Sequence, residues 1–240
     1  MDGMTASAGT LAVAEVFGPT VQGEGRTCGQ RASFIRLGGC NLKCRWCDTP
    51  YTWDASRYAL RQELQRRTAD DLLAEVLGHG TQVVVITGGE PLLQQGQSGW
   101  ARLMAGLGEA GREIEVETNG TVPPGDITAR LVTRFNVSPK LAHAGDPDRR
   151  RVRPGAVSAL LATGKAAFKF VCREPSDLDE VRDTARRLGI PPGLVQIMPE
   201  GTDPEMLTAR LRELAGPAIA AGYSLTPRLH ILLWGDERGR

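Results

Sequence analysis

Eight residues decide how this chain is organised: Cys40-Asn41-Leu42-Lys43-Cys44-Arg45-Trp46-Cys47. Three thiolates this close together can ligate three irons of a cubane iron–sulfur cluster and leave the fourth iron without a protein ligand. An open metal position is where catalysis takes place, whereas a fully ligated metal mainly stabilises a fold. The segment therefore predicts a catalytic iron–sulfur site.

The bulk properties indicate one globular domain. The chain has 240 residues, 41% of them hydrophobic, which is enough for one sizeable core. We expect a flexible lead-in over residues 1–10, without the pattern of a signal peptide, and one domain over residues 11–240. The net charge of +1 argues against a nucleic-acid partner, which needs a concentrated basic face. No apolar run reaches the roughly 18 residues of a membrane span.

The cysteine count favours a reducing compartment. The chain has five cysteines, an odd number, so a disulfide framework is not expected, and a cytoplasmic location fits better. Cys28 and Cys172 stand apart from the eight-residue segment; Cys28 is interpreted as a spare thiol and Cys172 as a small buried hydrophobic residue. A structural zinc site usually takes four ligands, and the chain has no second Cys-x-x-Cys pair. A zinc or iron–sulfur binding module is the non-enzymatic alternative.

Apolar runs alternate with helical patterns through most of the chain. This alternation predicts repeated βα units and a parallel sheet, open or closed into a barrel. The predicted strands are residues 11–17, 32–37, 82–86, 113–118, 131–137, 167–171, 194–198 and 229–233. One predicted helix begins after Thr68. Four more cover residues 100–108, 157–163, 176–188 and 204–221.

Polar residues follow successive predicted strands. In βα barrels the carboxyl ends of the strands form the active-site face, so this recurrence predicts an enzyme. Besides the cysteine segment, these strand-end groups are Thr87-Gly88-Gly89-Glu90-Pro91, Asn119-Gly120, Ser138-Pro139-Lys140 and Pro199-Glu200-Gly201.

Cys40, Cys44 and Cys47, with Trp46 before the last cysteine, resemble the cluster motif of radical S-adenosylmethionine (radical SAM) enzymes. The resemblance implies an α/β fold, an incomplete (β/α)6-type TIM-like barrel. It also implies that these cysteines bind a [4Fe-4S] cluster whose open iron holds SAM, the source of a 5′-deoxyadenosyl radical. Gly88-Gly89-Glu90-Pro91 resembles a SAM-binding segment of that family. The SAM-binding residues it implies are Trp46, Gly88, Gly89, Glu90, Thr118, Asn119, Ser138, Lys140 and Gln196.

A closer resemblance is to the family of 7-carboxy-7-deazaguanine synthases, from about Phe17 to His230. It implies conversion of 6-carboxy-5,6,7,8-tetrahydropterin with loss of ammonia, on the route to queuosine-type deazapurines. It further implies Mg²⁺, an external electron donor, and a homodimer. The resemblance is carried by Val21-Gln22-Gly23-Glu24-Gly25, Phe34-Ile35-Arg36-Leu37, Cys47-Asp48-Thr49, Glu117-Thr118-Asn119-Gly120, Val137-Ser138-Pro139-Lys140 and Gln196-Ile197-Met198-Pro199.

The same resemblance assigns the substrate side, with no catalytic residue beyond the cofactors. Glu24 and Glu117 can accept from pterin N–H groups, and Arg36 can pair with the substrate carboxylate, a buried ion pair being its alternative role. Thr49 is the expected Mg²⁺ ligand. The expected substrate-binding residues are Gln22, Gly23, Glu24, Arg36, Thr87, Glu117 and His230.

Two features depart from the family pattern. Arg228 stands where the family commonly carries Gln, two residues before His230, and the tail 234–240 is also different. Within the superfamily, the alternative is a glycyl-radical-activating enzyme that acts on a partner protein. The 22–25 loop and Asp48-Thr49 argue against that alternative.

Overall fold

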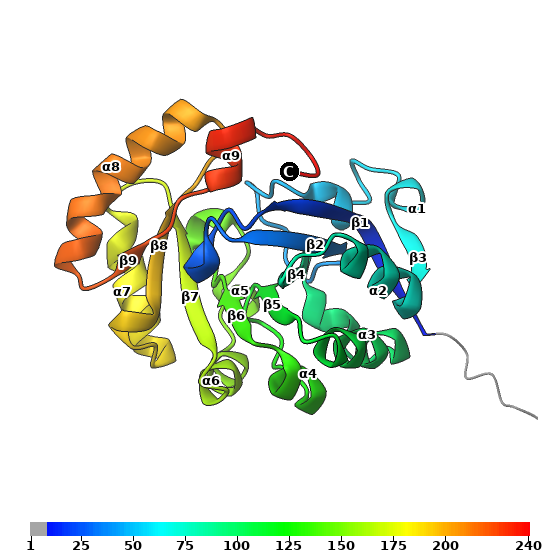
Figure 1. The fold of residues 1–240 in the computed structure, drawn as a ribbon. Helices are drawn as coiled ribbons and strands as arrows, with labels where there is room; N and C mark the ends of the chain where they lie inside the picture. Colours follow the sequence, from blue (N-terminus) through cyan, green and yellow to red (C-terminus); the bar gives the residue numbers. More distant parts are fainter. Residues whose placement is uncertain (1–8) are drawn as a thin grey trace, which may run out of the picture.

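A curved nine-stranded sheet, with helices on its outer side, forms the framework of the molecule (Figure 1). The computed structural model describes residues 9–240, so most of the predicted lead-in lies outside the described residues. The strands follow the order β3-β1-β2-β4-β5-β6-β7-β8-β9. They are β1 (Thr10–Val21), β2 (Arg31–Leu37), β3 (Gln65–Thr68), β4 (Val83–Gly88), β5 (Glu113–Thr118), β6 (Arg134–Val137), β7 (Ala166–Cys172), β8 (Val195–Pro199) and β9 (Ser224–Leu225).

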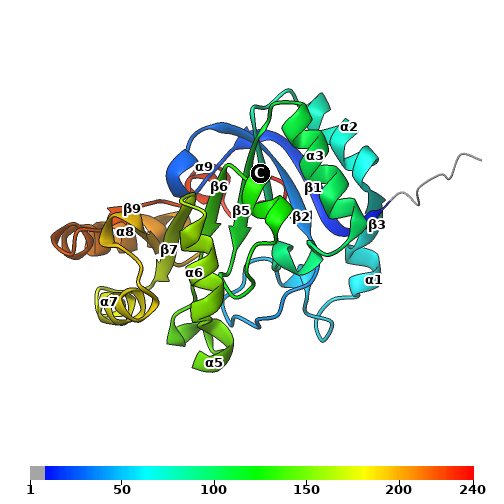
Figure 2. The same ribbon diagram turned by 90° about the horizontal axis from the view of Figure 1, so that it is seen from below.

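The helices lie mainly on the convex side of the sheet, as the view from below shows (Figure 2). Strand β2 and strands β4 to β9 are parallel to one another. Strand β1 runs antiparallel to both of its neighbours, β2 and β3. This confirms the predicted α/β, incomplete (β/α)6-type barrel. The helices are α1 (Leu60–Glu63), α2 (Ala69–Gly78), α3 (Ser98–Glu109), α4 (Asp126–Leu131), α5 (Asp148–Arg151), α6 (Pro154–Ala162), α7 (Asp177–Leu188), α8 (Pro204–Ala220) and α9 (Leu229–Trp234).

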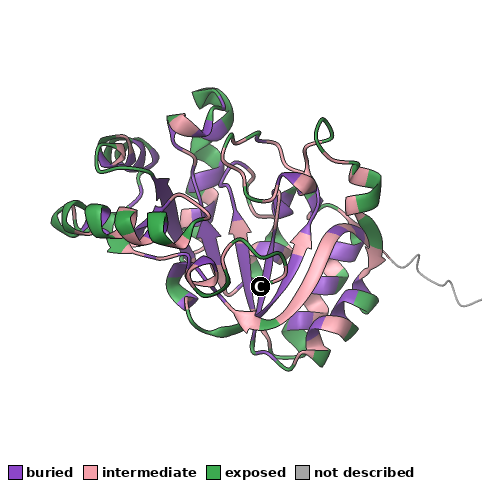
Figure 3. Cartoon of the chain, turned by 90° about the horizontal axis from the view of Figure 1, so that it is seen from above, coloured by how far each residue is buried: buried purple, intermediate pink, exposed green. Residues whose placement is uncertain are grey.

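The core lies between the sheet and these helices. The strands are largely buried and the outer faces of the helices exposed (Figure 3). Helix α2 illustrates the local cause: the Thr68 hydroxyl accepts from the Asp71 amide at 3.1 Å, and Leu72 and Val76 are buried against the sheet. Within residues 9–240, no helix combines the length and hydrophobicity needed to cross a bilayer.

Two predicted strands differ from the structure. Residues 229–233 form most of helix α9, so the predicted last strand is wrong. A short apolar run fits a helix or a strand equally well, and the sheet already ends at β9. The predicted strand 131–137 begins only at Arg134, because helix α4 occupies the residues up to Leu131.

The antiparallel direction of β1 changes where its loop lies. Val21 pairs with Arg31 at the start of β2, whereas the cysteine segment follows the end of β2. Residues 22–30, the hairpin tip, therefore lie at the start of strand β2, whereas the cysteines lie beyond its end. There the tip meets the last part of the chain: the Leu229 amide donates to the Gly23 carbonyl at 2.8 Å, and the Gly25 amide to the Thr226 hydroxyl at 2.7 Å. The two ends of the open sheet are joined at this seam.

Candidate active site

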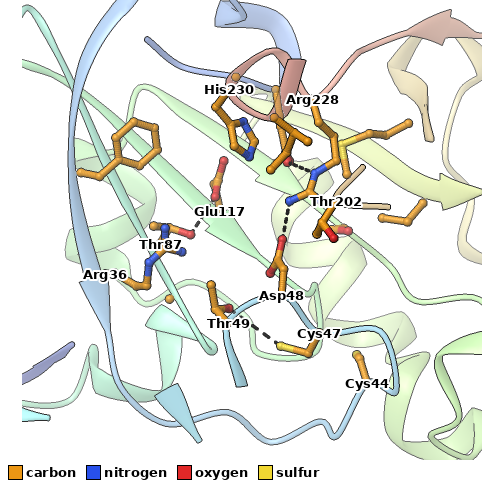
Figure 4. Close-up of a pocket in the computed structure, with 18 of the residues that line it drawn as sticks. Arg36, Cys44, Cys47, Asp48, Thr49, Thr87, Glu117, Thr202, Arg228 and His230 are labelled. Carbon is orange, nitrogen blue, oxygen red and sulfur yellow. Dashed lines mark hydrogen bonds and ion pairs between the residues drawn. The ribbon is translucent and has the colours of Figure 1, made fainter. Parts of the chain in front are cut away.

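A cavity of about 350 Å³ lies on the concave side of the sheet, between the cysteine segment and the hairpin tip (Figure 4). It brings together residues from the ends of most parallel strands, as expected for the active-site face of a βα barrel. The predicted residues that line it are Gln22, Gly23, Glu24, Arg36, Cys40, Cys44, Trp46, Cys47, Thr49, Thr87, Gly88, Gly89, Glu117, Thr118, Asn119, Ser138, Lys140 and His230.

The cysteine segment fits an iron–sulfur cluster. All three thiols are free, half-buried and face the cavity. N–H groups point at their sulfurs: the Leu42 amide lies 3.5 Å from Cys40 Sγ, and the Trp53 indole lies 3.3 Å from Cys47 Sγ. Such hydrogen bonds stabilise thiolate ligands and tune cluster potential.

The same thiols do not form a single-ion site. No group of three or more His, Cys, Asp or Glu side chains within residues 9–240 is arranged to hold one metal ion. A cubane cluster is compatible with this spread, because each thiolate ligates a different iron. Burial raises the pKa of Cys40 to about 12, so metal binding must displace a proton there.

Two glycines bring the end of β4 against the cysteine segment. A Cβ on Gly88 would lie 2.0 Å from the Leu37 carbonyl oxygen, and one on Gly89 would lie 2.1 Å from that of Gly39. Gly88 also has a φ of +135°, which side chains rarely adopt. Only a pair of glycines allows this backbone to reach the cavity beside Cys40.

Glu90 takes a different position from the expected one. Its side chain is fully buried and does not line the cavity. Its carboxylate accepts from the amides of Leu92 and Asn119 and from the Thr118 hydroxyl, at 2.7–3.1 Å. Burial raises the pKa of Glu90 to about 7, although these hydrogen bonds oppose the rise. Glu90 therefore fixes the end of β5, which presents Thr118 and Asn119 to the cavity.

The other predicted SAM-side residues form a connected wall. The Asn119 amide donates to Asn41 Oδ1 at 3.0 Å, which links β5 to the cysteine segment. The Lys140 ammonium donates to the Ser138 hydroxyl at 2.9 Å and lies 5.1 Å from the centre of the Trp46 ring. A cation, a hydroxyl and an aromatic face thus stand together beside the cysteines.

Gln196 lies apart from this wall. It is buried on β8, and it is absent from the residues that line the cavity. Its Oε1 is buried and has no hydrogen-bond partner among residues 9–240. Of strand β8, Met198 and Pro199 line the cavity.

On the far side of the cavity, Gln22, Thr87 and Glu117 form a hydrogen-bonded group. The Thr87 hydroxyl donates to Glu117 Oε2 at 2.7 Å, and the Gln22 amide donates to Glu117 Oε1 at 3.3 Å and to Glu115 at 3.2 Å. A carboxylate has about four acceptor positions, so Glu117 keeps capacity for a ligand.

Four charged side chains meet near this group. Glu24 accepts from the Lys169 ammonium and, at 3.0 Å, from Arg228 Nε, and Arg228 also pairs with Asp48 (Figure 4). Burial opposes ionisation of Glu24, but the charges of Lys169 and Arg228 lower its pKa well below the usual range. Lys169 and Asp48 were not among the predicted site residues. A lysine inside the apolar strand β7 was the available signal.

Arg36 and His230 reach the cavity with partners. Arg36 Nε donates to Glu15 at 2.5 Å, so the ion-pair role is present. Glu15 also accepts from the Tyr51 hydroxyl and from Arg238 of the tail. His230 projects from α9, and a Cβ on Gly23 would lie 1.9 Å from its Nδ1.

Burial lowers the pKa of His230, although the charge of Glu24 opposes this. The imidazole is therefore mainly neutral at neutral pH.

Comparisons with known proteins agree with this geometry. A sequence model of the radical SAM superfamily matches residues 34–198. A 7-carboxy-7-deazaguanine synthase of Pyrobaculum aerophilum is 39% identical over 95% of this chain and 96% of its own length. Another, of Rhodopirellula baltica, is 36% identical over 98% and 90%. The crystal structure of QueE from Escherichia coli superposes with a TM-score of 0.70 at 27% identity, covering 92% of this chain and 95% of that one.

Proposed function

Because this chain belongs to the radical SAM superfamily and, within it, to the 7-carboxy-7-deazaguanine synthases, we propose that it converts 6-carboxy-5,6,7,8-tetrahydropterin to 7-carboxy-7-deazaguanine with loss of ammonia. One observation carries the proposal from the structure: the cysteine segment and a wall of acidic and amide side chains face the same cavity. A flat, hydrogen-bonding substrate can therefore be held next to the radical source.

Cys40, Cys44 and Cys47 would hold the cluster. When bound there, the reduced [4Fe-4S] cluster and SAM supply the 5′-deoxyadenosyl radical that abstracts a hydrogen atom from the substrate. Around them, the backbone at Gly88 and Gly89 allows close approach, and Lys140 offers a cation to the SAM carboxylate.

The far side of the cavity would bind the pterin. Glu117 and Glu24 accept hydrogen bonds from its N–H groups, and the Gln22 amide and Thr87 hydroxyl orient Glu117. Arg36 donates its Nε–H to Glu15, so its two terminal nitrogens can bind the substrate carboxylate. These contacts would fix the plane of the substrate.

We also propose a Mg²⁺ site at Thr49, which lines the same cavity as Thr87 and Glu117 and whose hydroxyl lies 3.8 Å from Cys47 Sγ (Figure 4). Mg²⁺ commonly keeps several waters and takes few protein ligands, which suits one hydroxyl completed by substrate oxygens. The proposal further includes a homodimer, an external electron donor and a cytoplasmic location.

Anaerobic turnover tests the proposal. Protein reconstituted with iron and sulfide is given SAM, dithionite, Mg²⁺ and the carboxytetrahydropterin, and the product is identified by mass spectrometry. Formation of 7-carboxy-7-deazaguanine supports it. SAM cleavage that requires a partner protein, without this product, would favour a glycyl-radical-activating enzyme instead.

A further inference from the structure

The side chain of Arg228 touches three separate loops around the cavity. It lies between β9 and α9, and only 7% of its surface is exposed. Its Nε donates to Glu24 of the hairpin tip at 3.0 Å, its Nη1 to the Gly201 carbonyl after β8 at 2.6 Å, and its Nη2 to Asp48. The guanidinium therefore joins the hairpin tip to Asp48, the residue that follows the cysteine segment.

The charges around Arg228 make these contacts unequal. Glu24 has a second cationic partner, Lys169. Within residues 9–240, Asp48 forms an ion pair with Arg228 alone. Loss of Arg228 would leave the Asp48 carboxylate without that partner. A lysine at the same position could supply a charge, but a single ammonium cannot reproduce the fork that contacts both carboxylates.

Asp48 and Glu24 come from different loops and meet at the Arg228 guanidinium. Asp48 follows Cys47 directly, and Glu24 lies on the wall proposed to bind the pterin. A side chain that fixes one relative to the other also fixes the distance between the cluster ligands and the substrate wall. Radical transfer needs reacting atoms held in near-contact, so small displacements here are costly.

We propose that Arg228 is a positioning residue that sets the substrate wall in register with the cysteine segment. The inference rests on the proposed function. It predicts that loss of Arg228 loosens the hairpin tip and the 47–52 segment together, weakens pterin binding and leaves SAM binding intact.

The test uses Arg228→Gln and Arg228→Lys in the cluster-loaded, unreduced protein. Hydrogen exchange should rise in residues 22–28 and 47–52 in both variants, and calorimetry should show pterin affinity reduced about 10- to 100-fold, as for other residues that orient ligands. SAM affinity should stay within about twofold of the unmodified protein. Arg182→Gln, which removes an exposed pair on α7, serves as the control and should change none of these.

A charge-balanced variant separates positioning from charge burial. Arg228→Gln with Asp48→Asn removes both partners and should recover thermal stability. If positioning is the role, the double variant keeps the weak pterin binding and the raised exchange. Recovery of pterin affinity in the double variant would overturn the proposal, and so would unchanged exchange and affinity in Arg228→Gln.

The outcomes also separate this inference from the function it rests on. If the unmodified protein does not bind or convert the pterin, the proposed function fails. If it does so, and Arg228→Gln behaves as the unmodified protein, only the role of Arg228 fails.

Discussion

The indole nitrogen of Trp46 donates a hydrogen bond to Nδ1 of His143, 2.9 Å away. Because Nδ1 accepts, the proton of the neutral ring is on Nε2, which lies 3.1 Å from the Val171 carbonyl and donates to it. His143 thus ties the aromatic residue of the cluster motif to strand β7. The side chain beside the last cysteine is held in one orientation by a residue about a hundred positions along the chain.

Replacing His143 with leucine should weaken SAM binding roughly tenfold, because an indole N–H left without its partner costs about 1–3 kcal/mol. Cluster content should be unchanged. Calorimetric titration with SAM measures the effect. His79→Gln is the control, since His79 contacts Ser33 away from the cavity. Equal SAM affinity in His143→Leu and the unmodified protein would contradict the role given to this pair.

Cys44→Ala should lose cluster binding and turnover together, because two thiolates cannot hold the cubane in its site. Iron content, anaerobic absorbance and EPR of the reduced protein provide the measurement. Cys172→Ala is the matched control: Cys172 is fully buried on β7, so its loss should lower stability and keep the cluster. A Cys44→Ala protein with full activity would refute the ligand assignment.

Thr49→Ala should raise the Mg²⁺ concentration needed for half-maximal activity by about tenfold or more, with the cluster intact. Thr49→Ser keeps the hydroxyl and should behave as the unmodified protein. Activity is titrated against Mg²⁺ for all three proteins. The same Mg²⁺ response in Thr49→Ala and Thr49→Ser would exclude this hydroxyl as a ligand.

The ion pair of Glu24 and Lys169 should make stability depend on pH. The folded-state pKa of Glu24 lies below the ordinary 4.5, so its stabilisation is present above about pH 4.5 and is lost as pH falls. Lys169→Met should cost about 3–5 kcal/mol near neutral pH. It should also make the loss on acidification shallower, because a carboxylate paired with Arg228 alone is protonated more easily.

Urea unfolding at a series of pH values measures this dependence. Lys165→Met is the control, because the Lys165 ammonium donates to the carbonyls of Ala129 and Arg130 and pairs with no carboxylate of residues 9–240. Identical slopes for the unmodified protein and Lys169→Met would show that Glu24 does not depend on Lys169.

The parts of the site that depend on short stretches of sequence could be predicted from the sequence. The cysteine spacing and the strand-end groups are local, so Cys40, Cys47 and Lys140 lie in the cavity as expected. The direction of β1 depends on its pairing with β2, which no local pattern encodes. Side-chain orientation could not be predicted from the sequence either. Glu90 points into the core, where the Leu92 and Asn119 amides and the Thr118 hydroxyl donate to its carboxylate.

Long-range ion pairs were the other part that local pattern did not provide. Arg228 was noted as a departure from the family pattern, but its partners lie 180 and 204 positions away. The run 229–233 was assigned to a strand, since five apolar residues carry no clear period. In the structure its first residue, Leu229, donates its amide to the Gly23 carbonyl of the hairpin tip.

Product analysis under anaerobic conditions tests the central claim most directly. The reconstituted protein is supplied with SAM, dithionite, Mg²⁺ and 6-carboxy-5,6,7,8-tetrahydropterin, and 7-carboxy-7-deazaguanine, ammonia and 5′-deoxyadenosine are quantified together. The account predicts equal amounts of 7-carboxy-7-deazaguanine and ammonia. Accumulation of 5′-deoxyadenosine while the pterin is recovered unchanged would contradict it.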